Sequence, residues 1–223
     1  MRNILFDLDG TLIDHFTTIA KSIVHTQRTL GLPESDYATV RTTVGGSLPV
    51  TLSKLCGAEN IANAEPIFRA HFEEIIFDDV FALPGAEWIL KSLKERGAKL
   101  GVFTNKYTRH SRSVLKHLDL LDYFDMILGT GESDCPYRKP DPIFSAHALE
   151  KMNCTSEEAV LVGDSQYDIA ASEAGCMNCY LVATGSHSSP ELAKYITEDQ
   201  IFKNLYELGT QAFKLPVPTG YIV

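Results

Sequence analysis

The chain has 223 residues, of which 29 are acidic and 20 are basic, so its formal net charge at pH 7 is −9. Its composition, 44% hydrophobic and 22% charged, excludes a disordered tail, a collagen-like repeat and a disulfide scaffold. A surface this acidic repels phosphate backbones, so we expect no nucleic-acid partner. No apolar run approaches the roughly 18 residues of a membrane span. Asp7 and Asp9 interrupt the first apolar run, which argues against a signal peptide. We therefore expect a cytoplasmic protein with no membrane partner.

The first predicted element is a buried strand, Ile4–Phe6, which ends in an acidic turn. Asp7 and Asp9 follow it, Gly10 lets the chain turn away, and Thr11 offers a hydroxyl. Two carboxylates so close together repel each other unless a cation or a proton binds between them. The simpler interpretation, an acidic N-cap for the next helix, needs only one acidic side chain. The pair therefore favours a bound cation or proton.

The next stretch, about 70 residues long, shows helical patterns only. Apolar spacing predicts helices over Phe16–Leu30 and Ala64–Ile76, and glycine and proline residues punctuate the middle. Such a stretch is too long for a connection in an α/β fold. We interpret residues 14–83 as an inserted helical domain, called the helical insert below, and residues 1–13 and 84–223 as one α/β core domain.

Beyond the insert, short apolar runs alternate with helical patterns. Strands are predicted at Leu100–Phe103, Met126–Leu128, Val160–Val162 and Tyr180–Val182, and helices at Ala86–Arg96, Arg109–Leu118, Pro142–Met152 and Tyr167–Ala174. This alternation predicts an α/β fold with a Rossmann-like parallel sheet and helices on both faces. Such sheets bind ligands at the carboxyl ends of their strands, so the residues that follow each strand are the functional candidates. The tail, Lys214–Val223, is expected to be irregular.

Three further strand ends carry polar residues. Thr104 and Asn105 can donate hydrogen bonds to an anion, although such residues also cap helices. Lys139 offers an ammonium to a phosphate, although a lysine in a loop is more often solvated. Asp164 and Asp168 add two acids, although an acid at a helix start also serves as a cap or in the first turn. Together the strand ends match an oxygen-ligand cation such as Mg²⁺ beside a phosphoryl group.

These clusters resemble the four motifs of the haloacid dehalogenase superfamily in order and spacing. The matching segments are Asp7-Leu8-Asp9-Gly10-Thr11, Thr104-Asn105, Lys139-Pro140, and Gly163-Asp164 with Asp168. The helical insert resembles the small helical cap of the subfamily that contains phosphoglycolate phosphatases and β-phosphoglucomutases. The resemblance implies a Mg²⁺-dependent phosphatase that acts on a small phosphorylated metabolite. It also implies that the insert closes over the site and selects the substrate.

The resemblance implies roles for the acids that match the first and last motifs. Asp7 would be the nucleophile that forms an aspartyl-phosphate, and Asp9 the general acid and base. The carboxylates of Asp7 and Asp164 and the backbone carbonyl of Asp9 would bind Mg²⁺. Dehalogenases that attack carbon generally lack the second acid, so the presence of Asp9 favours phosphoryl transfer.

The remaining motif residues would surround the phosphoryl group. Thr104 and Asn105 would bind its oxygens, and Lys139 would balance the negative charge shared by the nucleophile and the substrate. Asp168 would act from behind the metal ligands by orienting a metal-bound water or Lys139.

Two departures from the family pattern bear on the substrate. β-Phosphoglucomutases carry a basic cap motif, whereas the corresponding stretch here, Val44–Pro49, contains no lysine or arginine. This favours a phosphatase over the alternative, a phosphomutase of the β-phosphoglucomutase type. The family often has serine after the acid that follows the first motif, where this chain has Asp14-His15. We interpret His15 as a partly exposed linker residue rather than a substrate contact.

The five cysteines do not predict a disulfide framework. Cys176 and Cys179 form a lone C-x-x-C with no second pair of zinc ligands, so we interpret them as packing residues at the start of a strand. The sequence is compatible with a monomer or a homodimer.

Overall fold

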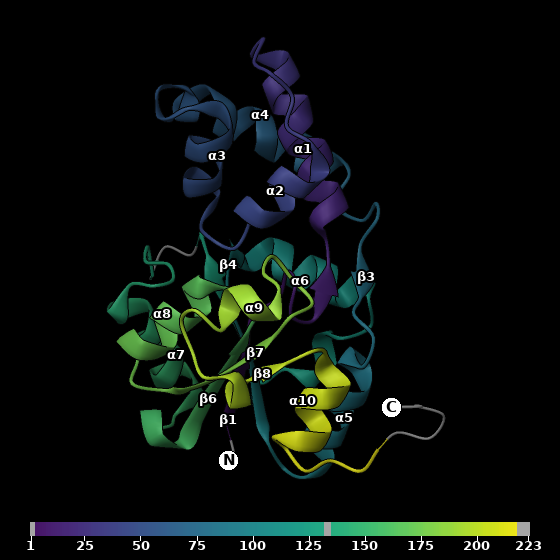
Figure 1. Cartoon of the computed structure of the whole chain (residues 1–223), viewed down its shortest axis with the longest axis vertical. Coiled ribbons are helices and arrows are strands. Elements are labelled where there is room, and N and C mark those ends of the chain that lie inside the picture. The colour runs from purple at the N-terminus through teal and green to yellow at the C-terminus, as the bar shows by residue number, and fades with distance from the viewer. Residues whose placement is uncertain (1–2, 132–134, 218–223) are drawn as a thin grey trace.

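A six-stranded parallel sheet forms the centre of the computed structural model, which describes residues 3–131 and 135–217 (Figure 1). Its strands lie side by side in the order β5-β4-β1-β6-β7-β8, and each pairing is parallel. They are β1 (Asn3–Phe6), β4 (Lys99–Tyr107), β5 (Met126–Thr130), β6 (Ala159–Gly163), β7 (Asn178–Val182) and β8 (Ile201–Phe202). The first five confirm the predicted strands, whereas β8 was missed because its apolar run is only 2 residues long.

Helices cover both faces of this sheet, as predicted. Ile4 and Phe6 of β1 belong to one apolar cluster, which includes residues from α5, α6 and α10. Leu5 belongs to a second cluster, with residues from α7 and α8. Because strand residues on both faces are buried, the strands are continuous apolar runs in the sequence. The helices are α5 (Ala86–Glu95), α6 (Thr108–His117), α7 (Pro142–Met152), α8 (Gln166–Ala174) and α10 (Leu205–Gln211).

The helical insert lies over the edge of the sheet at which the strands end (Figure 1). The chain enters it through β2 (Ile13–Asp14) and leaves it through β3 (Phe81–Ala82), which pair antiparallel. Its helices are α1 (Phe16–Thr29), α2 (Tyr37–Thr43), α3 (Leu48–Cys56), the short 3₁₀ helix η1 (Ala58–Asn60) and α4 (Ile61–Glu74). The two predicted helices correspond to α1 and α4.

The helices α1 and α4 pack against each other through one apolar stripe each. Phe16, Ile19 and Ile23 are buried along α1, and Phe68 and Phe72 are buried along α4. Residues three, four or seven apart share one face of a helix, so this spacing explains why the two segments fold as amphipathic helices. The same stripes bring Ile19, Phe68 and Phe72 towards the sheet, where they become walls of a cavity.

The strand β4 is longer than predicted. The sequence suggested Leu100–Phe103, whereas β4 extends over Lys99–Tyr107. Its pairing with β5 shifts register between Phe103 and Tyr107. Thr104 and Asn105 therefore lie within a strand, and the residue that caps α6 is Tyr107.

The remaining elements are short and follow the core helices and strands. They are η2 (Leu121–Tyr123), η3 (Ser156–Glu158), α9 (Ser189–Leu192) and η4 (Glu198–Gln200). Residues 214–217 of the predicted irregular tail contain no helix or strand, and residues 218–223 lie outside the described part of the chain. Cys176 is exposed, and Cys179 is buried in β7.

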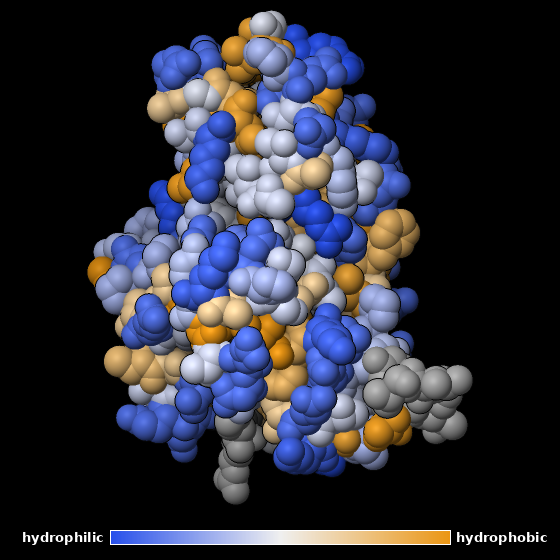
Figure 2. All heavy atoms as spheres, viewed as in Figure 1, coloured by the Kyte–Doolittle hydropathy of each residue, from blue (hydrophilic) through white to orange (hydrophobic). Residues whose placement is uncertain are grey.

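Hydrophilic side chains cover most of the face shown in Figure 2, over both the insert and the core. Within residues 3–131 and 135–217, every helix is too short or too polar to cross a bilayer.

Candidate active site

Three adjacent strands in the middle of the sheet place the principal side chains of the site. Asp7 directly follows β1, Thr104 lies near the end of β4, and Asp164 directly follows β6. Both β4 and β6 pair with β1, so these residues meet at one edge of the sheet. After Asp9 the chain turns at Gly10, whose φ of 87° lies in the left-handed region that favours glycine. The geometry follows the rule that such sheets present their ligand sites at the strand carboxyl ends.

A buried cluster of charge lies at this edge. One carboxylate oxygen from each of Asp7, Asp164 and Asp168 lies within 4.8 Å of the others, and all three residues are buried. Lys139 Nζ lies 3.0 Å from Asp7 Oδ1 and 2.6 Å from Asp168 Oδ1. Lys139 is itself only 2% exposed, so the solvated-loop interpretation of this lysine is wrong. Its contact with two acids offsets the cost of burying the ammonium.

Asp168 stabilises the start of α8 and also belongs to the buried cluster. Its Oδ2 accepts hydrogen bonds from Ser165 N at 3.1 Å and Ser165 Oγ at 2.7 Å, while its Oδ1 accepts one from Lys139 Nζ. The N-cap of α8 is Ser165, so the alternative interpretation of Asp164 as a helix cap is wrong. Asp168 thereby fixes the lysine relative to the end of β6.

A loop beyond β7 binds one carboxylate oxygen of Asp164, and the other carboxylate oxygen faces the buried cluster. Ser186 donates to Asp164 Oδ2 from its backbone nitrogen at 2.7 Å and from its hydroxyl at 3.0 Å. A Cβ on the neighbouring Gly185 would lie only 1.8 Å from the same oxygen, so the close approach requires glycine. Asp164 Oδ1 is buried and lacks a hydrogen-bond partner in the described residues. An unpaired buried carboxylate oxygen costs free energy unless a cation or proton binds it.

The acids in this cluster outnumber the cations, and their pKa values reflect it. Burial raises the pKa of Asp7 to about 6. The charge of Lys139 opposes this rise, and the charge of Asp168 adds to it. Burial and the charges of Asp168 and Asp7 also raise the pKa of Asp164 well above its ordinary value. Burial opposes the charge on Lys139, yet its two acidic partners raise the pKa of the ammonium. The unpaired Asp164 Oδ1 and the nearby Asp7 carboxylate therefore fit a small divalent cation, which prefers carboxylate oxygens, while Asp168 adds negative charge to the same cluster.

The Asp9 side chain makes different contacts. Lys106 Nζ lies 3.1 and 3.0 Å from the two Asp9 carboxylate oxygens, and His15 Nδ1 lies 3.6 Å from Asp9 Oδ1. Burial alone would raise the pKa of Asp9, but the charge of Lys106 and the contact with His15 hold it well below its ordinary value. In this arrangement Asp9 is an anion beside the cavity.

The interpretation of His15 as a partly exposed linker residue is wrong. Its side chain is fully buried, with Nδ1 3.2 Å from Lys106 Nζ and Nε2 2.9 Å from the backbone oxygen of Ile76. The latter contact joins the two connections between the insert and the core. Burial and the charge of Lys106 lower the pKa of this histidine, so the imidazole is neutral near neutral pH.

Asn105 holds the backbone of the lysine loop in place. Its Oδ1 accepts a hydrogen bond from Lys139 N at 2.8 Å, and its Nδ2 donates to Lys139 O at 3.3 Å. The same Nδ2 lies 3.5 Å from the backbone oxygen of Gly45 in the insert. Thr104 is buried beside Asp7 and contributes a hydrogen bond that lowers the pKa of that acid. Neither residue caps a helix, so the capping interpretation is wrong for both.

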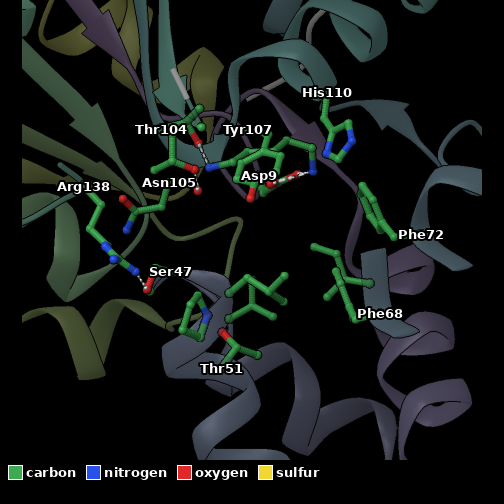
Figure 3. Close-up of a pocket in the computed structure, with 18 of the residues that line it drawn as sticks. Asp9, Ser47, Thr51, Phe68, Phe72, Thr104, Asn105, Tyr107, His110 and Arg138 are labelled. Atoms are coloured by element: carbon green, nitrogen blue, oxygen red, sulfur yellow. Dashed lines mark hydrogen bonds and ion pairs between the residues drawn. The ribbon is translucent and has the colours of Figure 1, made fainter. Parts of the chain in front are cut away.

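A cavity of about 540 Å³ lies between the sheet edge and the helical insert. Figure 3 shows Asp9, Thr104 and Asn105 on its core side, and Ser47, Thr51, Phe68 and Phe72 on its insert side. Arg138 of the core reaches across and donates to Ser47 Oγ at 3.2 Å. On another side, Arg41 of the insert donates to the backbone oxygens of Thr184 at 2.9 Å and Gly185 at 3.2 Å. The insert is therefore closed over the site.

Three residues of the site were not singled out from the sequence. Lys106 directly follows Thr104-Asn105, so the same strand end contained the signal. Ser186 follows β7 by four residues, and attention to a fifth strand end could have found it. Arg138 precedes Lys139, but nothing in a loop sequence indicates that it contacts residue 47 in the insert.

Comparison with known proteins identifies the family of this chain. Residues 4–182 match the model of the family described as haloacid dehalogenase-like hydrolase. The chain belongs to this family. It is 36% identical to a phosphoglycolate phosphatase of Aquifex aeolicus over 77% of this chain and 79% of the relative. It is 28% identical to a phosphoglycolate phosphatase of Nitrosospira multiformis over 93% of each chain.

A solved structure shares the whole architecture. A protein described as a predicted phosphatase from Clostridium acetobutylicum superposes with a TM-score of 0.87 at 28% identity, covering 96% of this chain and 99% of that one. The family therefore accounts for both the parallel sheet and the helical insert.

Proposed function

We propose that this protein is a phosphatase that hydrolyses a phosphate monoester of a small metabolite through an aspartyl-phosphate on Asp7. One observation carries the proposal: the buried Asp7 carboxylate lies 3.0 Å from the Lys139 ammonium and lines a cavity closed by the helical insert. A carboxylate beside a fixed cation, shielded from water, is suited to attack an anionic phosphoryl group. The relatives named phosphoglycolate phosphatase support the same reaction class.

Two in-line displacements complete the proposed reaction. An Asp7 oxygen attacks phosphorus, and the bond from phosphorus to the ester oxygen breaks. The anionic Asp9 first takes a proton from the singly protonated phosphate monoester, whose second pKa is about 6, and then gives that proton to the leaving alcohol. Asp9, now an anion, takes a proton from water, which attacks phosphorus and releases phosphate and free Asp7. The contact with Lys106 favours the anionic form of Asp9 that the second step requires.

The other motif residues bind and position the phosphoryl group. Lys139 offsets the charge that Asp7 and the phosphoryl oxygens share, and Asp168 orients that lysine through the 2.6 Å contact. Thr104 offers its hydroxyl to a phosphoryl oxygen. Asn105 also holds the Lys139 backbone through two hydrogen bonds, and its binding of a phosphoryl oxygen stays a prediction.

We assign the cation site to Mg²⁺. The carboxylates of Asp7 and Asp164 and the backbone carbonyl of Asp9 would hold the ion, with Asp168 behind them. A bound Mg²⁺ would supply positive charge to the phosphoryl oxygens, which carboxylates alone would repel. Ser186 fixes the orientation of Asp164 for this purpose.

The proposed organisation has residues 1–13 and 84–223 as the catalytic core domain and residues 14–83 as the cap that selects the substrate. We retain a monomer or homodimer and a cytoplasmic location as predictions. The alternative reaction, a phosphomutase, needs a site that grips a second phosphate. The stretch Val44–Pro49 lines the cavity without a basic residue, which favours the phosphatase.

Release of inorganic phosphate from two simple esters and one acyl phosphate tests the proposal. With Mg²⁺ present, the purified protein should hydrolyse acetyl phosphate, 4-nitrophenyl phosphate and phosphoglycolate, and chelation by EDTA should abolish turnover. Isomerisation of a sugar phosphate that depends on a bisphosphate primer, without phosphate release, would instead establish the phosphomutase.

The affinity for Mg²⁺ should depend on pH, because the cation binds only ionised carboxylates. The pKa of Asp7 is raised to about 6, so this acid gains a proton as the pH falls through this range, and the raised pKa of Asp164 acts in the same direction. We expect affinity to weaken by about tenfold per pH unit below about pH 6 for each linked proton. Titration calorimetry should accordingly show proton release on Mg²⁺ binding near pH 6. An affinity for Mg²⁺ that does not change between about pH 5 and pH 7 would contradict this assignment.

A further inference from the structure

The alcohol part of the substrate would occupy the end of the cavity remote from Asp7, so the walls of that end indicate its chemistry. The cavity volume, about 540 Å³, is the volume of about 18 water molecules at ~30 Å³ each. It lies in the range of about 300–1,000 Å³ that holds drug-sized ligands. A two-carbon alcohol such as glycolate would leave most of this space to water.

The insert supplies apolar walls. Phe68 and Phe72 of α4 stack with ring centroids 5.5 Å apart, and both line the cavity. Ile19, Val44 and Leu48 add aliphatic surface from α1 and from the start of α3. Figure 3 shows Phe68 and Phe72 across the cavity from Arg138 and Ser47. An apolar group placed against this wall would remove apolar surface from water, which favours binding.

The cations on the cavity walls near α4 already have acidic partners in the protein. Arg69 pairs with Glu65 and stacks on the Tyr107 ring, with its guanidinium carbon 3.8 Å from the ring centroid. Lys106 pairs with Asp9. Such neutralised cations provide little attraction for a second anionic group on the substrate.

His110 adds no positive charge at this end of the cavity. Glu73 of the insert contacts both Arg109 and His110 of the core. Burial, aided by the neighbouring cations and opposed by Glu73, lowers the pKa of His110 to about 4, so the imidazole is neutral near pH 7. The His110 ring adjoins the rings of Phe72 and Tyr107, with centroid distances of 5.6 and 5.5 Å.

Arg138, the remaining cavity arginine, lies on the opposite side. It directly precedes Lys139 and donates a hydrogen bond to Ser47 Oγ of the insert, across the cavity from Phe68 and Phe72. A second anion bound against Phe68 and Phe72, on the side opposite Arg138, would therefore meet apolar side chains. Burying a charge there without a partner is costly.

We infer that the preferred substrate is the phosphate monoester of a bulky, largely apolar and uncharged alcohol, with a ring that packs against Phe68 and Phe72. This inference rests on the proposed phosphatase function and narrows its substrate class. Phosphoglycolate, whose leaving group is small and anionic, fits the remote end poorly.

Steady-state kinetics with Mg²⁺ test the inference on two phosphate esters and one acyl phosphate. 2-Naphthyl phosphate represents the bulky apolar class, phosphoglycolate the small anionic class, and acetyl phosphate reports on the phosphoryl end alone. Because each methylene group buried in an apolar pocket is worth about tenfold or more in kcat/KM, we expect 2-naphthyl phosphate to exceed phosphoglycolate by at least about tenfold. Equal values, or a preference for phosphoglycolate, with acetyl phosphate hydrolysed, would overturn the substrate class alone. If none of the three compounds is hydrolysed, the phosphatase function is overturned as well.

A variant of Leu48 separates recognition by the wall from intrinsic ester reactivity. Leu48 is partly buried on the cavity wall and takes no part in the proposed chemistry. Leu48→Lys places a cation there, and we expect it to lower kcat/KM for 2-naphthyl phosphate and raise it for phosphoglycolate, so that their ratio falls at least about tenfold. Leu48→Met, the matched control, should leave the ratio within about threefold, because it conserves apolar volume.

An unchanged ratio in Leu48→Lys, with acetyl phosphate turnover intact, would overturn the inference. Loss of acetyl phosphate turnover would show that the lysine disturbs the whole site. The ratio of kcat/KM for 2-naphthyl phosphate to that for phosphoglycolate would then be measured in Phe68→Leu. A fall of this ratio by about threefold or more supports the inference, and no fall overturns it.

Discussion

Asp7→Asn is expected to lower kcat for every ester by about 10⁴-fold or more, because an amide is a poor nucleophile towards phosphorus and the aspartyl-phosphate cannot form. Asparagine keeps the shape of the side chain and its place after β1. Phosphate release under saturating substrate and Mg²⁺ measures the loss.

Stability measurements distinguish this loss from unfolding. Burial raises the pKa of Asp7 from an ordinary 3.8 to about 6, so the ionised side chain is unfavourable in the folded protein at neutral pH without a bound cation. The neutral amide removes that cost, and the melting temperature of Asp7→Asn in EDTA should equal or exceed that of the wild type. A variant that keeps substantial activity, or whose inactivity accompanies unfolding, would not support Asp7 as the nucleophile.

Lys139→Met is expected to cost both activity and stability. It removes the ammonium that lies 3.0 Å from Asp7 and 2.6 Å from Asp168, and leaves the buried acids facing one another. Breaking a buried ion pair by removing one partner typically costs about 3–5 kcal/mol. Denaturant unfolding in EDTA at neutral pH measures this loss, which should shrink as the pH falls through the pKa of Asp7, because a protonated acid no longer needs the cation.

Two further variants make the stability result specific. Lys91→Met, which replaces an exposed lysine, should change the free energy of unfolding by less than about 0.5 kcal/mol. Adding Asp168→Asn to Lys139→Met should restore part of the lost stability, because it removes one of the unpaired acids. Additive losses in the double variant would contradict direct coupling between Lys139 and Asp168.

The sheet and the residues at its edge were accessible from the sequence because both depend on local patterns. Runs such as Val160–Val162 are buried on two faces and therefore remain apolar throughout, which identifies them as strands of a covered parallel sheet. Since parallel strands end at a common edge, Asp7 and Asp164 could be placed together although more than 150 residues separate them. The order of the strand ends also gave the resemblance to the family.

Properties that depend on packing between distant segments were not accessible in this way. His15 has the composition and position of a linker residue, and only the return of the chain at Ile76 and the approach of Lys106 make it buried. Lys139 in isolation looks like a solvated side chain, and its burial depends on two acids from other strand ends.

The same limit applies to β4 and to the cavity. The extension of β4 beyond Phe103 depends on pairing with β5, which the apolar run does not encode. The volume over Asp7 depends on how closely α4 approaches the core, so spacing along the helix could not indicate the size of the substrate.

Trapping the covalent intermediate tests the central claim most directly. Wild-type protein mixed with Mg²⁺ and an ester labelled with ³²P in the phosphoryl group should be quenched in acid before the steady state, digested at acidic pH and sequenced by mass spectrometry. The account predicts an acid-stable, alkali-labile phosphoryl group on the Asp7 carboxylate, lost on a chase with unlabelled ester. A phosphoryl group on another side chain, or full turnover without any covalent label, would contradict it.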